Sequence, residues 1–238
     1  MHEILVQVFL FTLLPMAILL LTGIVALFRT PGPRLRSALQ HFAAGVVFEA
    51  AAVEVLPEIR QAHSPWPVIL GFALGTGLVL AVGQFSRRAE QKGTTSVAAL
   101  LTVTGIDVFI DGILIGIGFV GGAKVGVLLA LALTTEFLFV GFTTAATLAS
   151  TGFSSGRVVA SNGMLAIFVL LGASVGAIVL AHVPVPLQIG VLSFGVAALL
   201  YLVTEELLVE AHEVKETTFA AAMFFAGFLL FLVFGAFG

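Results

Sequence analysis

The chain has 238 residues, of which 60% are hydrophobic and 10% are charged, and its mean hydropathy is +1.19. Soluble globular domains carry about 25% charged residues, so this composition excludes a soluble domain and requires a lipid environment. Cysteine is absent, which excludes disulfides, thiolate metal sites and iron–sulfur clusters, and no basic stripe indicates binding to nucleic acid. The sequence therefore predicts an all-α integral membrane protein whose surroundings are membrane lipid.

Eight apolar runs follow one another along the chain, and each is long enough for a membrane-spanning helix of roughly 20 residues. We expect helices near 4–28, 37–57, 66–85, 97–120, 124–149, 158–181, 185–209 and 218–237. Short connections rich in Pro and Gly separate these runs and leave no room for a soluble domain. The beginning of the sequence lacks a basic region and a cleavage site, so no removable signal peptide is expected. Residues 1–238 are therefore predicted to form one transmembrane domain.

Basic residues predict the orientation of this bundle, because cytoplasmic loops carry an excess of Lys and Arg. The loops after the first, third, fifth and seventh helices contain Arg29, Arg34, Arg36, Arg87, Arg88, Lys92, Arg157 and Lys215. The loops on the opposite side contain only Arg60 and Lys124. This partition predicts that both termini are extracytoplasmic, in a multi-pass protein of the cell inner or plasma membrane.

Acidic residues lie where a lipid-embedded helix should have none. They fall within or near the ends of the predicted spans: Glu49, Glu54, Asp107, Asp111, Glu136, Glu205 and Glu206. A charge at the centre of the bilayer costs about 2.5–3.5 kcal/mol, and no basic residue within the spans can pair with these acids. Such acids must be protonated and hydrogen-bonded between helices, line a water-filled cavity, or coordinate cations.

The spacing of three of these acids favours a cation site. Asp107 and Asp111 are four residues apart, so both side chains lie on one face of a helix. Glu136 lies on the next helix, and it is about as far from the intervening turn as Asp107. The three carboxylates therefore fall at similar depth, near the middle of the membrane. Convergent oxygen donors without a counter-ion are typical of a metal site, so Asp107, Asp111 and Glu136 are the predicted ligands.

Other polar residues are candidates for additional ligands or for an ion pathway: Glu49, Glu54, Thr135, Glu205, Glu206, Glu210 and His212. Thr135, together with Thr104 and Thr134, follows the same face as the three acids, but Thr often hydrogen-bonds to its own helix backbone instead. His41 and His212 are expected at the cytoplasmic ends of the second and seventh helices. There, with the nearby glutamates, they form either an exit site or a solvated helix end.

Two segments of the sequence resemble each other. Residues 42–58 read FAAGVVFEAAAVEVLPE, and residues 194–210 read FGVAALLYLVTEELLVE. Phe, Glu, Leu and Glu coincide at 42/194, 54/206, 56/208 and 58/210. The segments belong to the second and seventh helices, five spans apart, so they cross the membrane in opposite directions. This predicts an inverted repeat of helices 1–3 and 6–8 around helices 4 and 5, a plan common among transporters with a site at the midplane.

The motifs on three helices resemble those of the ZIP (Zrt/Irt-like) metal transporters, and the resemblance covers nearly the whole chain. Residues 54–58 (EVLPE) are similar to the family's HLLPE, and residues 200–212 (LYLVTEELLVEAH) are similar to LYVxxEELIPEAH of bacterial members. Residues 107–116 (DVFIDGILIG) are similar to the metal-binding HNFPEGLAIG. The resemblance implies an eight-helix transporter of divalent metal cations, with both termini outside.

This chain departs from the family at the ligands. Asp107 and Asp111 stand at the family's His and Glu, and Val108 and Ile110 stand at Asn and Pro. In the fifth helix, Glu136 aligns either with the family's His or with the neighbouring polar position. The two-metal site is thus reduced to one carboxylate site, which is expected to favour Mn²⁺, Fe²⁺, Mg²⁺ or Ca²⁺ over Zn²⁺.

The sequence therefore predicts a transporter of divalent cations with no tightly bound cofactor and with a possible homodimeric assembly. The alternative is a ZIP-like membrane protein with another substrate, such as protons or a small organic cation, or without metal transport. An intramembrane enzyme is not expected, because both aspartates lie on one helix and no Ser–His pair or HExxH motif lies at membrane depth.

Overall fold

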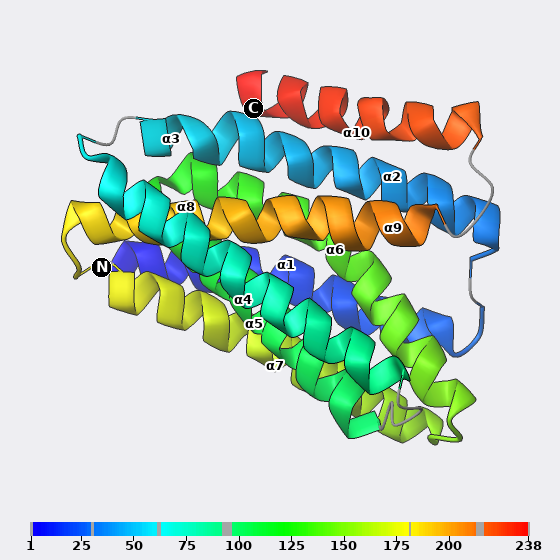
Figure 1. The fold of residues 1–238 in the computed structure, drawn as a ribbon. Helices are drawn as coiled ribbons and strands as arrows, with labels where there is room; N and C mark the ends of the chain where they lie inside the picture. The colour runs from blue at the N-terminus through cyan, green and yellow to red at the C-terminus, as the bar shows by residue number, and fades with distance from the viewer. Residues whose placement is uncertain are drawn as a thin grey trace. The chain divides into compact units, whose positions relative to one another are not determined.

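The computed structural model describes residues 2–29, 31–60, 63–91, 97–180, 182–212 and 217–237, with the side chains of 85–91 left out. Within these ranges every regular element is a helix (Figure 1). The elements are α1 (His2–Ala26), α2 (Pro33–Glu49), η1 (Ala50–Val55), α3 (Leu56–Arg60), α4 (Pro65–Gln91), α5 (Val97–Gly121), α6 (Ala123–Ser150), α7 (Ser155–Leu180), α8 (Val185–Tyr201), η2 (Leu202–Leu207), α9 (Leu208–Ala211) and α10 (Thr218–Phe237). The segments η1 and η2 are π-helical. The predicted all-α class is confirmed.

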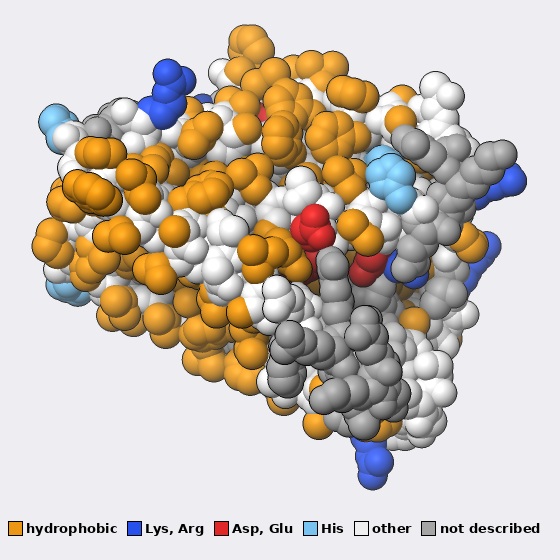
Figure 2. Space-filling model, viewed as in Figure 1, with side chains coloured by type: hydrophobic (Ala, Val, Ile, Leu, Met, Phe, Trp, Pro, Cys, Tyr) orange, Lys and Arg blue, Asp and Glu red, His pale blue; other side chains and the backbone are white. Residues whose placement is uncertain are grey.

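Seven helical segments of the described chain are long and apolar enough to cross a membrane, which identifies a multi-pass membrane protein. The predicted span 37–57 is helical throughout, as α2, η1 and α3 in succession, but it is not one of the seven. Gln40, His41, Glu49 and Glu54 make this segment less apolar than the others. Figure 2 shows hydrophobic side chains over a large part of the visible surface, as a lipid environment requires.

The chain divides into two compact units. Unit 1 comprises Met1–Thr30 and Gly77–His182, which include α1, α5, α6, α7 and the second half of α4. Unit 2 comprises Pro31–Thr76 and Val183–Gly238, which include the remaining elements. The single domain and the membrane orientation remain predictions. Among the basic residues used for that orientation, Lys92 and Lys215 lie outside the described residues.

Glycines bring α5 and α7 of unit 1 into backbone contact. A side chain at Gly112 would overlap the carbonyl oxygen of Val169, and one at Gly172 would overlap the carbonyl oxygen of Phe109. One turn further along each helix, Gly116 and Gly176 are equally confined. Each helix therefore carries a Gly-x-x-x-Gly pair, which lets membrane helices approach closely and gain van der Waals contact. This packing holds α5, with its two aspartates, closely against α7.

A buried asparagine joins three helices of unit 1. The side chain of Asn162 on α7 is fully buried, and its amide nitrogen donates hydrogen bonds to the carbonyl oxygens of Leu19 on α1 (3.3 Å) and Gly141 on α6 (3.2 Å). Gly23 makes room for this amide, because a side chain there would overlap Asn162 Nδ2. Asn162 thus ties α6, the helix of Glu136, to both α1 and α7.

We expect Asn162→Leu, which keeps the side-chain volume, to lower the free energy of unfolding by about 0.6–1.7 kcal/mol, the range of interhelical hydrogen bonds in membranes. Titration with a denaturing detergent, followed by circular dichroism, measures this change. Ser161→Ala on the same helix is the control and should stay within about 0.5 kcal/mol of the parent protein. An unfolding free energy of Asn162→Leu equal to that of the control would show that the two hydrogen bonds contribute nothing.

In unit 2, α2 and α8 are counterparts of each other. Both are 17 residues long, and Val185 at the start of α8 follows Pro33 at the start of α2 by 152 positions. The π-helical segments show the same shift, since η1 begins at Ala50 and η2 begins at Leu202. The shift equals that of the sequence similarity between residues 42–58 and 194–210.

The two counterparts run in opposite directions. Arg36, Ser37 and Gln40 at the start of α2 contact Glu210 and Ala211 at the end of α9, and α3 contacts α8. Figure 1 shows the antiparallel course of the two segments. A π-helical turn inserts one extra residue into a helix and is frequent at functional sites. Here the two π turns contain Glu54, Glu205 and Glu206.

Candidate metal centre

Three acidic side chains of unit 1 converge on one point. One carboxylate oxygen each from Asp107, Asp111 and Glu136 can be chosen so that all three lie within 4.8 Å of one another. Within the described part of the chain, no other group of three or more His, Cys, Asp and Glu residues has this arrangement. The predicted ligand set is therefore brought together.

Local sequence explains how the three acids meet. Asp107 and Asp111 lie one turn apart on α5, so their side chains share a helix face. The turn to α6 is short because Gly122 adopts a φ of 157°, a conformation that residues with a side chain rarely adopt. The helix α6 then returns alongside α5, and Glu136 comes level with the aspartates.

Two of the three acids are almost fully enclosed. Asp111 is 5% exposed and Glu136 is 1% exposed, whereas Asp107 is partly exposed. Like charges this close repel one another, and burial raises the cost of each charge. The group therefore needs protons or a cation to neutralise it. A divalent cation would supply two positive charges at once.

The spacing of the oxygens suits a hard divalent cation. Oxygens bound to Mg²⁺ lie about 2.1 Å from the ion and those bound to Ca²⁺ about 2.4 Å, so two oxygens on opposite sides of one ion are about 4–5 Å apart. The observed limit of 4.8 Å falls in this interval. The three donors are all carboxylates, a ligand type that suits Mg²⁺, Ca²⁺ and Mn²⁺.

The threonines near Glu136 bond to their own helix. Thr134 Oγ1 donates to the carbonyl oxygen of Ala130, and Thr135 Oγ1 donates to that of Ala132 at 2.6 Å. The alternative given for these residues, a hydrogen bond to the helix backbone, is therefore the observed arrangement. A hydroxyl that donates its proton still has lone pairs, so a ligand role for Thr135 remains a prediction.

The other candidate pathway residues belong to unit 2. Glu49, at the end of α2, is fully buried. Glu54 and Glu206 are half-buried, and Glu205 is exposed. The remaining two, Glu210 and His212, lie at the end of α9 and take part in a polar network with α2. A role for these six residues in ion transfer remains a prediction.

Sequence reasoning missed the residues that support the site. Gly112 directly follows Asp111, and its spacing to Gly116 is a recognisable signal, repeated by Gly172 and Gly176 on α7. For Asn162, the corresponding signal was a polar amide side chain within a long apolar run, where such a side chain is costly. Both signals were present in the sequence, but neither says which helix is the partner.

Comparison with known proteins finds no match for this chain, neither among models of protein families nor among curated proteins. Its function is therefore inferred from its own residues.

Proposed function

We propose that this protein is a membrane transporter that moves divalent metal cations through the carboxylate site formed by Asp107, Asp111 and Glu136. One observation carries the proposal: three carboxylates converge within 4.8 Å on two apolar helices long enough to cross a membrane. Ionisable residues at membrane depth are costly, and those that persist mark ion pathways and substrate sites. A hydrogen bond between two helices requires only two polar groups, whereas three carboxylates converge here.

The site favours hard ions. All three ligands are carboxylates, and the family's histidines are replaced in this chain, so the borderline-soft nitrogen donors that suit Zn²⁺ are missing. Mn²⁺, Fe²⁺, Mg²⁺ and Ca²⁺ are the expected substrates. The ion is cargo here and not a resident cofactor.

The wider proposal is a ZIP-like architecture of eight spans with both termini outside and an inverted repeat of helices 1–3 and 6–8. The continuous helix from α2 through α3 is the candidate for the eighth span, because Pro33–Arg60 is long enough to cross a bilayer. The common 152-residue shift of α2/α8 and η1/η2 supports the repeat. Membership of the family and location in the inner or plasma membrane are parts of this proposal.

Ion flux into proteoliposomes is the test. Purified protein is reconstituted into vesicles and offered Mn²⁺, Fe²⁺, Mg²⁺, Ca²⁺ and Zn²⁺ singly and in equal-concentration mixtures, with Asp111→Ala as control. We expect uptake of at least one of the four harder ions, lost in the control. If Zn²⁺ outcompetes all four, the ion preference is wrong even though metal transport stands.

The alternative function is transport of protons or of a small organic cation. It is favoured by the same replacement of the motif histidines, since acids that accept protons can also relay them. Acidification of the vesicle lumen without flux of any divalent ion would select this alternative and exclude the metal transporter.

A further inference from the structure

Two histidines of unit 2 lie together outside the carboxylate site. His41 is on α2 and His212 follows α9, and their ring centroids are 5.1 Å apart with the rings inclined by 65°. His41 is 3% exposed, and His212 is exposed. A buried imidazole beside an exposed one gives a pair that a dissolved ion can reach from one side.

The hydrogen bonds set the tautomer of both rings. His41 Nδ1 lies 2.8 Å from the carbonyl oxygen of Ser37, and His212 Nδ1 bonds to the carbonyl oxygen of Leu208. A carbonyl oxygen only accepts, so Nδ1 carries the proton and the lone pair of each neutral ring is on Nε2. Metal-binding histidines are held in this way, with the second nitrogen bonded to a carbonyl or carboxylate.

The Nε2 nitrogen of His41 has no hydrogen-bond partner among the described residues. This atom is also buried. Buried polar nitrogens without a partner are rare and call for an explanation such as an ion. This nitrogen is on the ring that faces His212, the neighbouring imidazole.

The separation of the rings fits shared coordination. Imidazole nitrogens lie about 2.0–2.1 Å from Zn²⁺, so two rings on one tetrahedral ion have centroids about 5 Å apart. The observed 5.1 Å meets this requirement. A hollow of about 700 Å³, lined by Thr204, Leu208, Val209 and His212, leaves room for water to complete the coordination.

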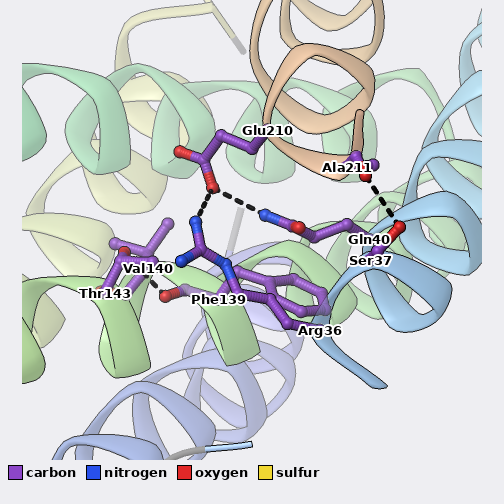
Figure 3. A network of polar contacts seen from close by, with 8 residues as sticks. All are labelled: Arg36, Ser37, Gln40, Phe139, Val140, Thr143, Glu210 and Ala211. Carbon is purple, nitrogen blue, oxygen red and sulfur yellow. Dashed lines mark hydrogen bonds and ion pairs between the residues drawn. The ribbon is translucent and has the colours of Figure 1, made fainter. Parts of the chain in front are cut away.

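A polar network holds the two segments in place. Arg36 Nη2 and Gln40 Nε2 both donate to Glu210 Oε2, at 2.9 and 2.6 Å, and Ser37 Oγ donates to the carbonyl oxygen of Ala211 at 2.7 Å (Figure 3). Two of these residues, Gln40 and Ala211, directly precede His41 and His212. The charge of Arg36 is neutralised by Glu210, so the network adds no net positive charge. The pair of imidazoles is therefore preorganised.

We propose that His41 and His212 form a second divalent-cation site, with imidazole nitrogens as donors and Zn²⁺ or a similar borderline-soft ion as ligand. Its donor class differs from that of the carboxylate site, so the two sites prefer different ions. The proposal does not depend on transport, because it concerns binding to unit 2 alone.

Zn²⁺ binding to the full chain tests this proposal. The protein is purified without a polyhistidine tag, placed in lipid nanodiscs and titrated with Zn²⁺ by calorimetry, in an Asp111→Asn background that removes the carboxylate site. We expect one Zn²⁺ per chain and an affinity at least about tenfold lower after His212→Ala. His182→Ala is the matched control, because His182 is also exposed and bonds through Nδ1 to a carbonyl, that of Ile178.

A second variant tests the buried histidine of the pair, His41. His41→Gln should weaken Zn²⁺ binding as His212→Ala does. Equal Zn²⁺ affinity in the Asp111→Asn background with and without His212→Ala would overturn the site, as would an equal loss in the His182→Ala control. Failure of the carboxylate site proposed for transport would be seen in a separate measurement. In that case, Asp111→Asn would leave Mn²⁺ binding unchanged.

Discussion

Replacing Asp111 by Asn should abolish divalent-cation flux and lower the affinity for Mn²⁺ at least about a hundredfold. Mutation of a group that only supports a metal ligand commonly costs 10–100-fold in affinity, so loss of a charged ligand should cost at least as much. Asn keeps the size of the side chain, and the packing around this 5% exposed residue should persist. Flux into proteoliposomes and Mn²⁺ titration in nanodiscs measure the two effects.

Stability provides an independent readout of the same change. Without metal, the three carboxylates repel one another, so Asp111→Asn should be at least as stable as the parent protein. With Mn²⁺ at a hundred times its dissociation constant, the parent protein should gain about 2.7 kcal/mol and the variant much less. Glu3→Gln, which removes an exposed carboxylate near the start of α1, should keep both the flux and the Mn²⁺ effect. Parent-like flux in a folded Asp111→Asn protein would refute the role of this acid.

Replacing Gly172 by Ala should lower the free energy of unfolding by about 1–3 kcal/mol, the usual cost of forcing atoms into a well-packed core. The added methyl group would overlap the carbonyl oxygen of Phe109 on α5, and backbone cannot move aside as a flexible side chain can. The helices α5 and α7 would have to separate, and α5 carries Asp107 and Asp111.

Gly163 supplies the matched control for this substitution. It lies on the same helix, and a side chain there would come no closer than 3.6 Å to a side-chain atom of Leu20. Gly163→Ala should therefore be neutral or stabilising by up to about 1 kcal/mol, because Ala favours helices over Gly. Detergent-induced unfolding of the two variants gives the comparison. Equal unfolding free energies would show that the backbone contact of α5 and α7 does not limit stability.

The helices could be predicted from sequence because apolar runs of the required length are unambiguous when the chain holds few charges. The expected run 97–120 is observed as Val97–Gly121, and 218–237 as Thr218–Phe237. The carboxylate group was also predictable, since one helical turn and one short Gly-rich connection fix which side chains come level. Both the helices and the carboxylate group depend only on residues close together in the sequence.

The interhelical contacts could not be predicted in this way. Asn162 lies 143 residues from Leu19, and nothing local specifies that its amide reaches that carbonyl oxygen. The π-helical turns were also missed, because the extra residue in η1 and η2 leaves the apolar pattern almost unchanged. Similarly, the ring pair of His41 and His212 depends on the antiparallel packing of two distant segments.

The central claim is that one divalent cation binds simultaneously to Asp107, Asp111 and Glu136. A crystal structure of the protein with Mn²⁺, with the ion located by its anomalous scattering, tests this claim most directly. We expect one anomalous peak about 2.1–2.4 Å from a carboxylate oxygen of each of the three residues. Mn²⁺ bound elsewhere in a protein that transports it, with the three acids unoccupied, would contradict the account.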